Sequence, residues 1–90
     1  MSHRHAPQFE TVWVDVPENA GPAYESALSS VCETVGCFFL DPSARSWRVE
    51  GVKPVGEGCS ELVAALALAA LASGVAARLE RAPVAAEGWL

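Results

Sequence analysis

The side chains that could do chemistry are few, and their spacing matches no familiar catalytic or metal site. The three cysteines, Cys32, Cys37 and Cys59, are odd in number and lack the paired spacing of a zinc site. We therefore predict reduced thiols that pack as small hydrophobic residues in a cytoplasmic protein. His3 and His5 could bind a metal ion weakly, but so close to the terminus they more often belong to a frayed segment.

The sequence also gives little support for a phosphate-binding or nucleic-acid-binding site. Gly51, Gly56 and Gly58 do not follow a strand with the spacing of a nucleotide-binding loop, so we expect no cofactor in these 90 residues. The pair Phe38–Phe39 and Trp47 is similar to the stacking positions of RNA-binding ferredoxin-like domains. However, the net charge is −5 with only six basic residues, which argues against nucleic acid and leaves a basic protein as a compatible partner.

The elements that must position these residues begin with a strand. In Phe9–Val16, Val12, Val14 and Val16 share one face, while Thr11, Trp13 and Asp15 share the other, which is the alternation of a half-buried strand. A helix should follow over about Ala20–Thr34, with Asn19 as its N-cap and Gly36 as its stop.

A hairpin and a second helix come next. Cys37–Leu40 and Trp47–Lys53 read as paired strands, and alternation in the latter puts Arg48 and Glu50 opposite Trp47 and Val49.

The run Leu62–Ala72 has no polar side chain, and Ser60 before it and Gly74 after it predict a helix. We expect this helix to be buried nearly all round, because it is too short to cross a membrane. Val75–Arg81 should form a last strand, with Ala77 and Leu79 facing inward and Arg78 and Glu80 outward.

The order of strand, helix, strand, strand, helix, strand predicts a ferredoxin-like α+β fold, with a four-stranded antiparallel sheet and two helices on one face. We expect a single domain over 1–90, with its core in 9–82 and a linker beginning in 83–90. The residues expected in the core are Val12, Val14, Leu28, Val31, Val49, Leu62, Leu66 and Leu79.

The uncovered face of the sheet is the candidate site. Strand parity gathers there an aromatic side chain among mixed charges, which is typical of a protein-binding patch. An ordinary solvated sheet face is the alternative, and the chemistry alone favours it slightly. The candidate residues are Thr11, Trp13, Asp15, Arg48, Glu50, Arg78 and Glu80.

Three short motifs resemble the N-terminal domain of the bacterial methyltransferase that modifies ribosomal large-subunit protein eleven. The segment 47–52, WRVEGV, is similar to the third strand of that domain, and 79–83, LERAP, to its fourth strand after an Ala/Leu-rich helix. The closing EGWL of 87–90 resembles the acidic-x-Trp-aliphatic step that ends it. Val84 and Ala85 depart from the family, which tends to be acidic there.

The resemblance implies a function that the residues alone do not. In that family the N-terminal domain recognises the ribosomal protein, and a following Rossmann-like domain binds S-adenosylmethionine and methylates amino groups. The resemblance therefore implies a substrate-recognition domain without its catalytic half and without a cofactor of its own. The alternative is a stand-alone ferredoxin-like regulatory module that forms a homodimer through sheet edges or binds a small ligand.

Overall fold

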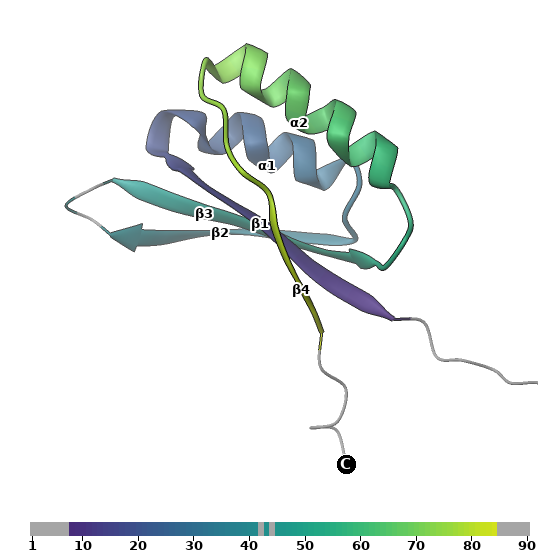
Figure 1. The fold of residues 1–90 in the computed structure, drawn as a ribbon. Coiled ribbons are helices and arrows are strands. Elements are labelled where there is room, and N and C mark those ends of the chain that lie inside the picture. Colours follow the sequence, from purple (N-terminus) through teal and green to yellow (C-terminus); the bar gives the residue numbers. More distant parts are fainter. Residues whose placement is uncertain (1–7, 42, 44, 85–90) are drawn as a thin grey trace, which may run out of the picture.

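The computed structural model describes residues 8–41, 43 and 45–84, and four antiparallel strands in it form one sheet. Across the sheet their order is β2 (Thr34–Asp41), β3 (Ser46–Pro54), β1 (Phe9–Pro17) and β4 (Glu80–Pro83). Both helices lie on the same side of this sheet (Figure 1). The predicted ferredoxin-like arrangement is therefore confirmed. In chain order the elements are β1, the short 3-10 helix η1 (Glu18–Ala20), α1 (Gly21–Ser29), β2, β3, α2 (Cys59–Ser73) and β4.

The core lies between the sheet and α1. Alternation along β1 buries Val12, Val14 and Val16, as predicted, and Val49 of β3 lies directly opposite Val14. Of the eight expected core residues, Val12, Val14, Leu28, Val49 and Leu62 are buried, while Val31, Leu66 and Leu79 are partly buried and pack against the rest.

Helix α1 is shorter than the predicted span of 20–34. It ends at Ser29, and Thr34–Gly36 already pair with Val52–Glu50 of β3. The prediction of Gly36 as a helix stop is therefore wrong, because β-branched residues beside an open sheet edge gain more from strand pairing than from a further helical turn. Asn19 is not the cap either, since it lies within η1, and α1 begins at Gly21 with Pro22 in its first turn.

Helix α2 begins earlier than predicted. Its N-cap is Gly58, in a left-handed conformation with φ of 67°, so Ser60 lies inside the first turn and is not the cap. A Cβ at position 58 would lie 2.8 Å from the Val31 side chain, which adds a steric reason for glycine. At the other end Gly74 is the C-cap with φ of 73°, as predicted.

The expectation that α2 is buried all round is wrong. Only Leu62 and Ala69 are buried, whereas Val63, Leu68 and Leu71 are 68%, 66% and 81% exposed. The reason is geometric: α2 packs mainly against α1 and η1, so it contacts the domain along one stripe. The other side of this apolar helix faces solvent.

Strand β4 is shorter than predicted and begins five residues later. Its four residues pair with Glu10–Trp13 of β1. The preceding segment 75–79 does not pair with the sheet, and at its start the hydroxyl of the buried Tyr24 donates a 2.6 Å hydrogen bond to the carbonyl of Val75. Leu79, at the end of this segment, is partly buried and packs against the core.

In the described ranges, 8–41, 43 and 45–84, no helix is long and apolar enough to cross a membrane. Two histidines and the closing motif, His3, His5 and 87–90, lie outside these residues.

Candidate protein-binding face

The open face of the sheet is built by residues that lie opposite one another on neighbouring strands. Register places Asp15 opposite Arg48 and Trp13 opposite Glu50, so the side chains predicted from parity are brought to one surface. Opposed side chains on one face of an antiparallel pair lie about 4.5–5.5 Å apart at Cβ. β1 and β3 are the two inner strands, so this group lies at the middle of the sheet.

Trp13, Arg48 and Asp15 contact one another at the middle of this face. The Arg48 guanidinium lies 5.2 Å from the centre of the Trp13 ring, and donates two hydrogen bonds of 2.8 and 3.1 Å to Asp15. Hydrogen bonding to Asp15 raises the pKa of Arg48 above its ordinary value, so its charge is permanent. The acidic partner holds the guanidinium over the indole, so an aromatic ring and a cation lie together at fixed positions on this face.

The remaining predicted residues are placed less uniformly. Thr11 and Glu80 lie on the same face, with Glu80 opposite Trp13 across the β1–β4 pair. Arg78 does not lie on the sheet, because β4 begins only at Glu80. Its side chain is 88% exposed and lies 3.6 Å from the Glu80 carboxylate, so it reaches the face only from beside the strand.

Phe38 belongs to this face and was missed. It pairs with Arg48 across β2 and β3, and its side chain is 52% exposed. Had the strand been predicted to begin at Thr34, alternation from Thr34 through Gly36 would have put Phe38 on the open face. A short run of 37–40 gives no such parity, since its apolar residues do not alternate.

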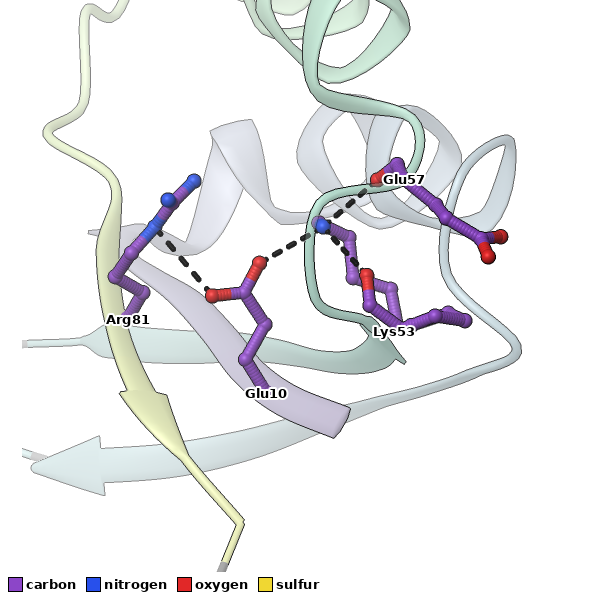
Figure 2. A network of polar contacts seen from close by, with 5 residues as sticks. Glu10, Lys53, Glu57 and Arg81 are labelled. Carbon is purple, nitrogen blue, oxygen red and sulfur yellow. Dashed lines mark hydrogen bonds and ion pairs between the residues drawn. The ribbon is translucent and has the colours of Figure 1, made fainter. Parts of the chain in front are cut away.

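The charged residues Glu10 and Lys53 are buried in the core. Neither of them was singled out from the sequence. The ammonium of Lys53, with no exposed surface, lies 2.8 Å from the Glu10 carboxylate and hydrogen-bonds to the carbonyls of Pro54 and Glu57 (Figure 2). Arg81 of β4 approaches the other Glu10 oxygen at 3.7 Å. These contacts join β1, β3 and β4, so we interpret the network as one that stabilises the sheet.

The cysteines do not share one environment. Cys32 is buried, Cys37 is half-buried and Cys59 is exposed, so the prediction of buried thiols is wrong for Cys59. Burial raises the pKa of Cys32. Burial and then the charge of Glu25 raise the pKa of Cys37. Across the part of the chain that the structure describes, no three metal-ligating side chains come together.

Comparison with known proteins adds evidence on the fold alone. No family model and no curated protein matches this sequence. Among solved structures, a Bacillus cereus protein related to NIF3 is similar over 94% of this chain, with 14% sequence identity and a TM-score of 0.55. This chain spans 28% of the length of that protein. The likeness is one of backbone arrangement.

Proposed function

We propose that this domain recognises a basic protein through the open face of its sheet. The observation that carries the proposal is the Arg48 guanidinium fixed over Trp13 by Asp15, at the centre of the one sheet face that the helices leave free. Central aromatic and arginine side chains dominate protein-binding energies. Asp15 is paired with Arg48 and Glu80 with Arg78, so Glu50 beside Trp13 is the carboxylate that favours a partner carrying lysine or arginine.

The resemblance to the ribosomal-protein methyltransferase makes this partner more specific. Under that reading the domain binds a ribosomal large-subunit protein, and a domain outside these 90 residues binds S-adenosylmethionine and transfers the methyl group. The basic character common to proteins that contact RNA fits the acidic chain. The motifs in 47–52 and 79–83 and the βαββαβ order support this reading.

The test is binding of the purified ribosomal protein followed by amide and indole NMR shifts. We expect shifts to gather on β1 and β3, and Trp13→Ala to weaken binding by ~2 kcal/mol or more because it removes the central anchor. Arg48→Glu should weaken it too, because it removes the guanidinium that lies over Trp13 and leaves Asp15 without its hydrogen-bond donor. Leu71→Ala, at an exposed site on α2, is the matched control and should leave affinity unchanged. Shifts confined to the helices would refute the proposal.

A further inference from the structure

The outer edge of β2 is open to pairing. β2 is the terminal strand of the sheet, and in the described part of the chain no strand pairs with its outer side. An eight-residue strand therefore presents a row of backbone N–H and C=O groups that fit another extended strand.

The side chains along this edge lack the usual protection against pairing. Phe38, Phe39 and Leu40 are 52%, 50% and 44% exposed, and no residue of 34–40 is charged or a proline. Edge strands of monomeric proteins normally carry lysine, proline or an inward charge. A register shift between Phe39 and Asp41 disturbs only the far end, which leaves Thr34–Phe39 regular.

We propose that β2 pairs with β2 of a second copy of this chain, in antiparallel orientation about a two-fold axis at Cys37. In an antiparallel pair, residues that lie opposite each other point to the same face of the sheet. The two-fold axis must therefore place one residue opposite the same residue of the other copy. Cys37 is that residue here, because it is the middle of the uncharged segment 34–40. This register pairs the segment with itself. It creates one eight-stranded sheet from two four-stranded ones.

Side-chain size favours this occupant and this register. Gly36 comes to lie opposite Phe38, and Val35 opposite Phe39, so each phenyl ring meets a smaller residue of the other copy. Within one chain the Phe38 ring already leans on Gly36, where an added Cβ would lie 3.2 Å from it. A ring that covers a glycine in an edge strand is a known way to stabilise pairing. A charged peptide would find no ionic partner along 34–40.

The arrangement has a consequence for the open face. A two-fold axis perpendicular to the sheet keeps the helices of both copies on one side and both Trp13 faces on the other. The dimer would therefore offer two copies of the candidate binding face in one plane. The dimer itself does not depend on the proposed function, since it uses the edge of β2 and not Trp13.

Sedimentation and light scattering of the full chain test the proposal. We expect twice the mass of the chain, falling to one chain on dilution. Phe38→Lys should be monomeric where the unchanged chain is dimeric, because a lysine on the edge opposes pairing. Leu71→Lys on exposed α2 and Trp13→Ala on the open face should both stay dimeric. Circular dichroism confirms that each variant is folded.

Amide hydrogen exchange gives a second readout at the backbone. Amides within 34–40 should become more protected as protein concentration rises, and this dependence should vanish in Phe38→Lys. A chain that is monomeric at every concentration would overturn the proposal. So would a dimer that Leu71→Lys dissociates and Phe38→Lys does not, because that result places the interface on α2.

Discussion

At the scale of single residues, both burial and a neighbouring carboxylate act on the pKa of the Cys37 thiol. Burial and the contact with the Glu25 carboxylate both raise its pKa, so the thiolate fraction near neutral pH is small. We expect alkylation by iodoacetamide in the order Cys59, Cys37, Cys32, which follows their exposure. Timed quenching and mass spectrometry measure the three rates.

The substitution Glu25→Gln isolates the contribution of charge. Removing the carboxylate lowers the pKa of Cys37 toward its ordinary value, which raises its thiolate fraction and its alkylation rate. Cys59 provides the internal control and should react at an unchanged rate. An unaltered rate at Cys37 would mean that burial alone protects this thiol.

The buried pair of Lys53 and Glu10 supports a prediction about stability. Lys53→Met leaves the Glu10 carboxylate buried at 7% exposure with only the more distant Arg81, and should cost ~3–5 kcal/mol of unfolding free energy. Adding Glu10→Leu should recover part of this loss, because the stranded charge is then gone. Urea unfolding measures both variants.

A surface pair gives the matched control for that experiment. Arg45 contacts Glu18 at 3.1 Å, but their side chains are 72% and 48% exposed. Arg45→Met should therefore change stability by less than about 1 kcal/mol. If Lys53→Met cost no more than Arg45→Met, the buried network would not stabilise the fold.

At the scale of elements, α2 shows that an apolar helix need not be a core helix. Leu62 is 1% exposed and Leu71 is 81% exposed on the same helix. Leu62→Ala should cost ~2–5 kcal/mol through lost burial and a cavity. Leu71→Ala should change stability by ~0.5 kcal/mol or less, since it removes little buried surface. Thermal and urea unfolding of the two variants compares these losses directly, and equal losses would mean that α2 is buried on both sides.

The element boundaries show where sequence reasoning stops. Alternation in β1 could be read directly, because Val12, Val14 and Val16 recur at every second position. In β3 the charged Arg48 and Glu50 flank the inner-face Val49 in the same way. The end of α1 could not, since Val31 and Val35 continue a helical stripe while Val35 in fact pairs with Gly51. The local sequence pattern does not show whether these residues gain more free energy from a further helical turn or from pairing with the edge of a sheet.

At the scale of the whole molecule, the order of elements was predictable and the exposure of their faces was not. Whether α2 contacts the sheet depends on where α1 packs, and the pattern of one segment does not determine this.

The buried ion pair could have been predicted from the sequence. Glu10 has the parity of Val12 and Lys53 has the parity of Val49, so alternation alone puts both charges on the inner face. The open-face group of Trp13, Asp15 and Arg48 followed from parity as well, whereas Phe38 needed the register of β2.

The charge of the whole chain separates its two proposed interactions by the sign of their response to salt. Two copies with a net charge of −5 repel each other, so self-association through the uncharged edge of β2 should strengthen when sodium chloride screens that repulsion. Binding of a basic protein to the open face should weaken in the same salt series, because its attraction is screened. Sedimentation and calorimetric titration across that series measure the two affinities separately. Self-association that weakened with salt would point to an ionic interface between copies, and so to a surface other than 34–40.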